Sequence, residues 1–192
     1  MNSHNDKQER FLQLFLPLQS RLEKFILVQV RNREMAKDIM SETVMLAFES
    51  FDSLKNDETF LSFLFTIASR VSSRRFKNSH RMAEYSEQYA EELMDSGISP
   101  EDAADVAILR SAIQQLPEMQ REAIIMHEIL DLPLDEVLKI QGGTLSGVKV
   151  RLMRARRQLA KMLASPESDE AFKNGAFKNK SVMLLLLSLL HF

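Results

Sequence analysis

The sequence contains no cysteine and no tryptophan, and only five glycines and five prolines in 192 residues. Without cysteine there is no disulfide framework and no thiolate metal site, which suits a reducing cytoplasm. Scarce glycine and proline, together with eleven methionines, favour an all-α chain, and no stretch alternates as a β-strand does. Residues 1–10 lack the apolar core of a signal peptide, so we expect a cytoplasmic protein.

Charge is distributed unevenly along the chain, although the formal net charge is only −2. Residues 82–109 carry acids but no lysine or arginine, whereas residues 70–81 and 149–161 are strongly basic. Two basic segments with an acidic connector suggest two contact modules joined by a linker that avoids a polyanion.

Residues 134–163 show the pattern of a helix-turn-helix. A short amphipathic run ends at Gly142–Gly143, where glycine can take the left-handed conformation that stops a helix. Thr144 or Ser146 can then cap a second helix. One stripe of that helix is apolar: Val148, Leu152, Ala155, Leu159 and Met162. The other faces are basic, which favours insertion into the DNA major groove. The alternative is a surface helix with a solvated positive face.

The first half of the chain predicts helices over residues 8–30 and 34–51 and a third from Phe60 onward. Pro17 either kinks the first helix or marks its start. Thr59 or Asp57 could cap the third. Three helices of this length can bury a common core.

In the second half, serine followed by Pro100 and acids predicts a helix start, and Pro117 predicts another. We therefore expect two small helical domains: residues 8–80, an acidic linker 81–99, and a helix-turn-helix domain 100–163. The tail, residues 164–192, ends in an apolar run about half as long as a membrane-spanning helix. It could fold back, bind a partner helix or lie in a membrane interface.

Catalysis has little support in the sequence. The histidines are scattered, and the glycine pair lacks the lysine of a phosphate loop. We expect no enzyme activity, no metal, no cofactor and no small-molecule substrate.

Four motifs, in order, resemble the extracytoplasmic-function class of bacterial sigma factors. They are DIMSET at residues 38–43, FLSFLFTIASR at 60–70, LPEMQREA at 116–123 and VKVRLMRAR at 148–156. The resemblance covers residues 11–161 and implies a transcription initiation factor. A sigma region 2-like domain would dock on core RNA polymerase and engage the melted downstream promoter element. A region 4-like domain would read the upstream element of promoter DNA.

The resemblance also implies an anti-sigma factor as a further partner. One alternative is a degenerate sigma-like adaptor that binds polymerase or a regulator without reading promoters. Another is a helix-turn-helix repressor whose first domain dimerises or senses a ligand.

The resemblance, together with the charge pattern, assigns candidate contacts. Polymerase-binding candidates are Asp38, Glu42 and Thr43. Asp38 and Glu42 lie one helical turn apart and can face a basic partner, unless they are a solvated acidic face. Candidates for the displaced single strand are Arg70, Arg74, Arg75 and Lys77. Phe63 and Phe65 could stack on bases or belong to the core.

Candidates in the helix-turn-helix are Thr144, Ser146, Lys149, Arg151 and Arg154, with Arg156 and Arg157 facing phosphate. The turn departs from the family pattern at Leu138, Gln141 and Gly143. Gly147, inside the helix, should cost about 1 kcal/mol relative to alanine. We therefore expect the second domain to pack loosely, to bind DNA weakly, or to need polymerase to hold its shape.

Overall fold

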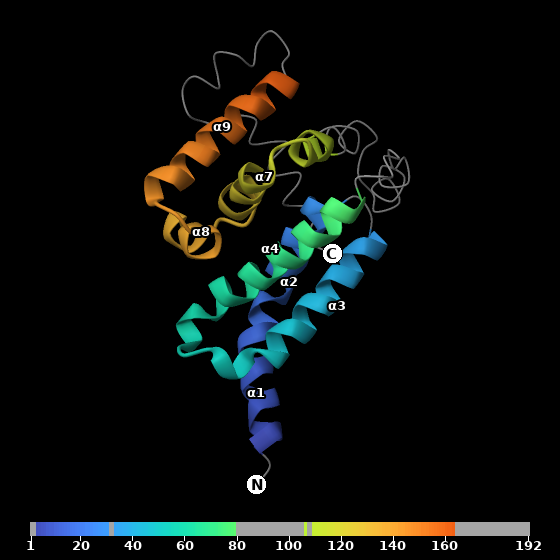
Figure 1. Cartoon of the computed structure of the whole chain (residues 1–192), viewed down its shortest axis with the longest axis vertical. Coiled ribbons are helices and arrows are strands. Elements are labelled where there is room, and N and C mark those ends of the chain that lie inside the picture. Colours follow the sequence, from blue (N-terminus) through green and yellow to red (C-terminus); the bar gives the residue numbers. More distant parts are fainter. Residues whose placement is uncertain (1–2, 31–32, 80–105, 107–108, 164–192) are drawn as a thin grey trace.

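The computed structural model describes residues 3–30, 33–79, 106 and 109–163, and every regular element in these ranges is helical. The expected linker 81–99, the helix start at Pro100 and the tail 164–192 lie outside the described residues. Figure 1 shows two groups of helices, with α1 to α4 in one and α7 to α9 in the other. The expectation of an all-α chain is confirmed.

Pro17 interrupts the first predicted helix. Helix α1 (Ser3–Phe15) is followed by a 3-10 turn, η1 (Leu16–Leu18), and then by α2 (Gln19–Gln29). Proline lacks a backbone N–H, and the tighter turn accommodates it. Phe11 of α1 is 3% exposed, and its ring meets Phe48 and Phe51 edge-on, at 5.3 Å in each case. These ring contacts fix α1 against the rest of its group.

Helices α3 (Arg33–Glu49) and α4 (Phe60–Ser79) pack against each other. Two 3-10 turns connect them, η2 (Phe51–Ser53) and η3 (Asp57–Thr59). Turn η3 leads directly into α4, and the N-cap of η3 is Asn56, not one of the predicted residues Thr59 and Asp57. Asn56 Oδ1 accepts a hydrogen bond from the backbone N–H of Glu58 at 3.0 Å. Asp57 instead pairs with Arg10 of α1.

In the second group, residues 109–114 are helical, and Pro117 precedes α7 (Glu118–Ile124) as predicted. A π-helical turn, η4 (Ile125–Ile129), extends α7, and the backbone N–H of Leu130 donates to the Ile125 carbonyl at 3.0 Å. Helices α8 (Leu134–Gln141) and α9 (Leu145–Leu163) follow.

The two groups are in direct contact. Arg110 is 5% exposed and donates to the carbonyls of Leu27 and Val30, each at 2.6 Å, near the end of α2 where carbonyls lack helical partners. Buried apolar side chains from both groups form one continuous cluster. The division of the chain into residues 8–80 and 100–163 therefore stays a prediction.

Serines from α4 add to this contact. The Ser69 hydroxyl donates to Oε1 of Glu122 at 2.5 Å, and Ser73 donates to Glu118 one turn away. Two serines of α4 thus bind acids of α7, and α4 also packs on α8.

Candidate nucleic-acid interface

The turn between α8 and α9 is tight and depends on glycine. Gly142 has φ 71° and Gly143 has φ 93°, both in the region that favours glycine. The Gly142 backbone N–H donates to the Leu138 carbonyl at 2.7 Å, which closes α8. Thr144 Oγ1 accepts from the Gly147 N–H at 3.1 Å and so caps α9. Of the two predicted caps, Thr144 is the one the structure uses.

Three residues at which the turn departs from the family pattern, Gln141, Gly147 and Leu138, are well accommodated in the structure. Gln141 Nε2 donates to the Met119 carbonyl at 2.9 Å, and its Oε1 accepts from Arg151 Nη1 at 3.0 Å. Gly147 lies in the first turn of α9 and not in its interior, so the expected cost of a mid-helix glycine does not apply. Leu138 is half-buried and packs against the core. Loose packing, one of the outcomes expected for the second domain, is therefore not found at the turn, whereas weak DNA binding stays a prediction.

One face of α9 is buried on α7 and α8. Val148, Leu152, Ala155 and Leu159 are each at most 3% exposed, as the stripe predicted. Met162 is 38% exposed and Ala160 is buried instead, so the prediction failed at the end of the helix. Packing on this face fixes which residues point outward.

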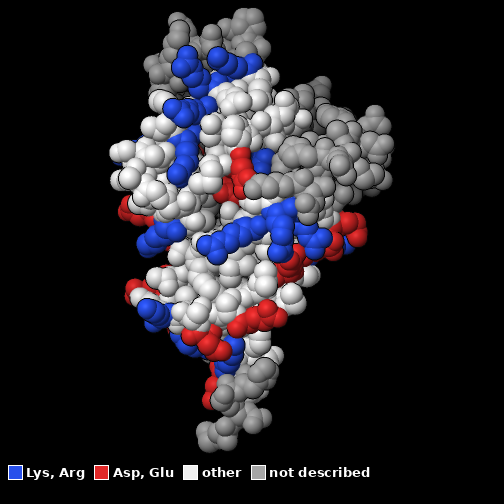
Figure 2. All heavy atoms as spheres, viewed as in Figure 1, with Lys and Arg blue, Asp and Glu red and all other residues white. Residues whose placement is uncertain are grey.

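The outward faces of α9 carry free cations. Lys149, Arg154, Arg157 and Lys161 are exposed, and within the part of the chain that the structure describes none has an acidic partner. Figure 2 shows lysine and arginine side chains along the length of α9. Thr144 and Ser146 are exposed beside them at the start of the helix. A row of unpaired cations on an exposed helix can contact phosphates and base edges.

Two other arginines of α9 are already engaged. Arg156 Nε donates to Glu128 Oε1 at 2.9 Å, and the Glu128 side chain is only 14% exposed. Arg151 Nη1 reaches the Gly142 carbonyl at 3.4 Å besides Gln141. Arg156 thus ties α9 to η4, while Arg151 braces the turn. Both arginines were predicted to contact DNA, and their pairing with Glu128 and Gln141 was not predicted.

The basic end of α4 differs from α9. Arg70, Arg74 and Arg75 are exposed there, and the side chain of Lys77 lies outside the described residues. Arg74 Nη2 pairs with Glu42 Oε1, and Arg75 Nη2 lies 3.0 Å from Glu42 Oε2. In the structure a predicted polymerase-binding residue, Glu42, therefore pairs with two predicted nucleic-acid-binding residues, Arg74 and Arg75. Figure 2 shows acidic side chains next to this basic band.

The three polymerase-binding candidates have different positions. Asp38 is exposed and has no partner among the residues described, and Glu42 is half-buried beneath the two arginines. Thr43 is 0% exposed. Thr43 therefore belongs to the core and not to the exposed acidic face, which corrects its placement with the surface residues.

The two candidate stacking residues belong mainly to the core. Phe65 is 0% exposed, and its ring centroid lies 5.2 Å from that of Phe25. Phe63 is half-buried, 6.1 Å from Phe60. The suggestion that Phe65 offers a stacking surface was wrong.

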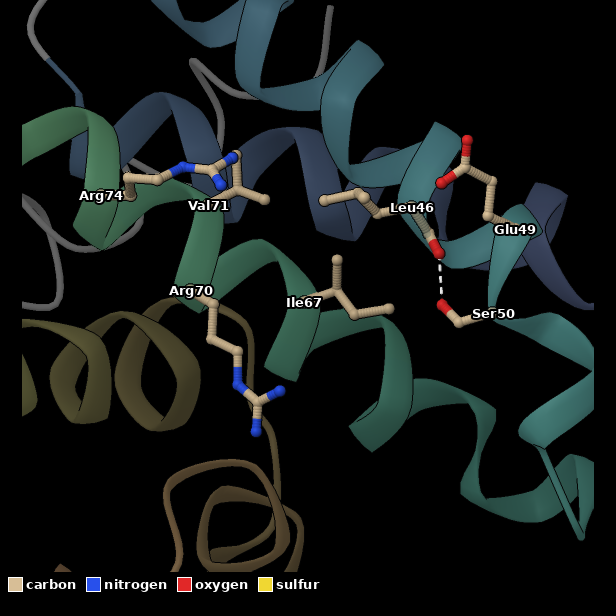
Figure 3. A pocket seen from close by; sticks show the side chains of 7 residues that line it. All are labelled: Leu46, Glu49, Ser50, Ile67, Arg70, Val71 and Arg74. Carbon is tan, nitrogen blue, oxygen red and sulfur yellow. Dashed lines mark hydrogen bonds between the residues drawn. The ribbon is translucent and has the colours of Figure 1, made fainter.

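A groove of about 490 Å³ lies between α3 and α4 (Figure 3). Its lining residues are Leu46, Glu49, Ser50, Ile67, Arg70, Val71 and Arg74. Arg74 lies over Val71, whereas Arg70 points away from α3. An apolar floor next to arginines can hold a flat apolar group with an attached anion.

Two neighbouring ionisable residues of α7 are buried behind the helix-turn-helix. Arg121 is 3% exposed and Glu122 is 1% exposed. Burial lowers the pKa of Arg121 and raises the pKa of Glu122, because desolvation disfavours the charged form of each. The Ser69 hydrogen bond opposes the shift at Glu122 by stabilising its carboxylate. Glu122 lies at the interface between the two groups of helices, where Ser69 of α4 binds it, whereas Arg121 donates to the carbonyls of Gln114 and Leu116 within its own group.

Within the described residues, no cluster of His, Asp or Glu could hold a metal ion. No helix in those same ranges is long and apolar enough to cross a membrane.

Comparisons with known proteins match both halves of this architecture. The family "Sigma-70, region 4" matches residues 107–159. RNA polymerase sigma factor SigV of Bacillus subtilis (strain 168) is 29% identical over 126 residues, covering 66% of this chain and 74% of that protein. ECF RNA polymerase sigma factor EcfG of Rhodopseudomonas palustris (strain TIE-1) is 27% identical over 145 residues, covering 74% of this chain and 78% of that one.

The fold also resembles that of sigma factor RpoE from Bartonella quintana, solved in complex with the anti-sigma factor NepR. The TM-score is 0.60 at 24% identity, covering 81% of this chain and 97% of that one. The chain is therefore similar over most of its length to RNA polymerase sigma factors, among them a member of the extracytoplasmic-function class, and the predicted resemblance to that family is confirmed.

Proposed function

We propose that this chain is a sigma factor that binds core RNA polymerase and directs promoter-specific transcription initiation. The observation that carries the proposal is α9, a helix with one buried face and a row of exposed cations without acidic partners among the described residues. It follows a turn whose two glycines have positive φ. That combination supports insertion into the major groove of an upstream promoter element.

Within α9 we assign the contacts by their availability. Lys149 and Arg154, with Thr144 and Ser146 at the helix start, would face base edges and the nearest phosphates. Arg157 would reach the phosphate backbone. Arg151 and Arg156 would act by holding the turn and the helix in place, because their guanidinium groups already have partners.

In the N-terminal group, Asp38 and Glu42 would meet a cationic surface of polymerase. The basic end of α4, with Arg70, Arg74 and Arg75, would bind the displaced strand of the melted downstream element. The groove between α3 and α4 supports this role, since it offers an apolar floor beside two of these arginines.

We infer that the protein works in the cytoplasm, where polymerase is, and acts by binding and not by catalysis. We also infer an anti-sigma factor as a partner, because the similar RpoE from Bartonella quintana is solved with one. The two domains would be residues 8–80 and 100–163. The adaptor alternative depended on an eroded turn, and the braced turn removes that support.

The test is run-off transcription with purified protein, core polymerase and genomic fragments of the source bacterium. We expect discrete transcripts that require the protein and that the Lys149→Ala/Arg154→Ala variant does not produce. Co-elution with polymerase on gel filtration but no transcripts would support the adaptor instead. Failure to co-elute would contradict both.

A further inference from the structure

Glu42 is shared by two arginines of α4. Its Oε1 accepts from Arg74 Nη2, while its Oε2 accepts from Arg75 Nη2 at 3.0 Å and Nε at 3.2 Å. The Glu42 side chain is 19% exposed, against 59% for Arg74 and 45% for Arg75. A single half-buried carboxylate thus neutralises much of the basic end of α4.

This pairing has a consequence for binding. Three of the about four acceptor sites of the Glu42 carboxylate are occupied, so a cation from another protein competes with Arg74 and Arg75 for it. A nucleic-acid phosphate can reach the remaining N–H groups of the two arginines, but the nearby negative charge of Glu42 repels it and offsets their positive charge. A partner that binds one side of the cluster therefore makes the other side more available.

We propose that Glu42 shields Arg74 and Arg75 from nucleic acid until a cationic surface of polymerase takes the carboxylate. This inference rests on the proposed function, since it couples two contacts of a sigma factor. Binding of polymerase raises the affinity of α4 for the single strand. By thermodynamic reciprocity, the strand raises the affinity for polymerase by the same factor.

Arg70 and Asp38 lie close to the cluster of Glu42, Arg74 and Arg75 but are not part of it, so the shielding does not extend to them. Arg70 lies on the same helix without an acidic partner among the residues described, so it can attract a strand at any time. Asp38 is exposed one turn before Glu42 and can attract polymerase at any time. Weak encounters therefore precede the exchange at Glu42.

The first test measures binding of a fluorescein-labelled single-stranded oligonucleotide to the full chain, without polymerase. Glu42→Gln should raise the affinity about three- to tenfold, because two exposed ion pairs are released. Two more phosphate contacts should also steepen the salt dependence, log K against log salt, by about 1.4. The matched control is Glu34→Gln, which removes the same charge from the same helix at an exposed pair with Lys37. It should change neither quantity.

Equal affinities for Glu42→Gln and Glu34→Gln, including no measurable binding by either, would overturn the shielding. The gain must also vanish in a triple variant, Glu42→Gln with Arg74→Gln and Arg75→Gln. A gain that persists there would equally overturn it. Helical circular dichroism and an unchanged thermal midpoint establish that each variant folds.

A second test removes the arginines instead of Glu42 and measures binding to core polymerase. Arg74→Gln/Arg75→Gln releases Glu42, so binding to core polymerase should tighten about two- to fivefold while oligonucleotide binding weakens. Weaker polymerase binding would contradict the coupling. The oligonucleotide measurement needs no polymerase, so failed shielding is distinguishable from a failed run-off assay, which concerns the proposed function.

Discussion

The two basic helices α9 and α4 look alike in the sequence and differ in the folded protein. On α9, Lys149, Arg154 and Arg157 have no acidic partner among the described residues. On α4, Arg74 and Arg75 are held by Glu42. The comparison teaches that the count of cations on a helix does not give the charge available to DNA. Availability depends on acids that approach from other elements.

The largest effect should come from removing free cations. Lys149→Ala/Arg154→Ala should weaken binding to a promoter duplex about ten- to a hundredfold and reduce the salt slope by about 1.8. Fluorescence anisotropy across a salt series measures both. Lys24→Ala/Lys37→Ala removes the same charge outside α9 and should change little. An unchanged slope in the first variant would show that these residues do not contact phosphate.

The next largest effect should come from reversing the charge of Asp38, which has no partner among the described residues. Asp38→Arg should weaken binding to core polymerase about tenfold or more, because it places a cation where the partner surface is basic. Surface plasmon resonance with immobilised polymerase measures this. Glu23→Arg makes the same charge change at an exposed position of α2 and serves as control. Normal binding by Asp38→Arg would remove α3 from the polymerase interface.

Neighbouring arginines of α9 should separate stability from DNA binding. Arg156→Ala should lower the free energy of unfolding by about 1–2 kcal/mol, because it leaves the largely buried Glu128 carboxylate without its donor. Arg157→Ala should leave stability nearly unchanged and reduce the salt slope by about 0.9. Urea unfolding and the anisotropy series distinguish them. If Arg157→Ala lowered the free energy of unfolding and Arg156→Ala did not, the pairing of Arg156 with Glu128 would not stabilise the fold.

The smallest effect is a dependence of stability on pH. Because burial raises the pKa of Glu122 above its ordinary 4.5, the folded protein retains a proton that the unfolded chain loses. The free energy of unfolding should therefore fall as pH rises from 4.5 through the raised pKa. Glu122→Gln keeps a polar partner for Ser69 and should flatten this fall, as urea unfolding at several pH values would show. An equally steep fall in the variant would assign the dependence to other groups.

Local pattern was enough to predict the helical class, the glycine turn and most of the buried stripe of α9, and it narrowed the cap of α9 to Thr144 or Ser146. Each depends on residues only a few positions apart, whose geometry is set by helix periodicity and backbone conformation. The break at Pro17 and the start after Pro117 could be predicted for the same reason.

The partners of the cations could not be predicted from local pattern. Glu128 lies 28 residues from Arg156, and Glu42 lies 32 residues from Arg74. Only the packing of whole helices brings them together. Gln141 was misinterpreted for a related reason, since its partner Met119 is 22 residues away in α7. A polar residue beside a turn indicates a weak turn only when nothing distant binds it.

Site-specific photo-crosslinking tests the central claim most directly. A photoreactive phenylalanine analogue replaces Arg154 in one protein and Arg75 in another, and each is assembled with polymerase on a promoter found by run-off transcription. We predict that position 154 crosslinks to the duplex of the upstream element and position 75 to the melted strand of the downstream element. No crosslink from position 154, or crosslinks from both positions to the same element, would contradict the division of promoter contacts between α9 and α4.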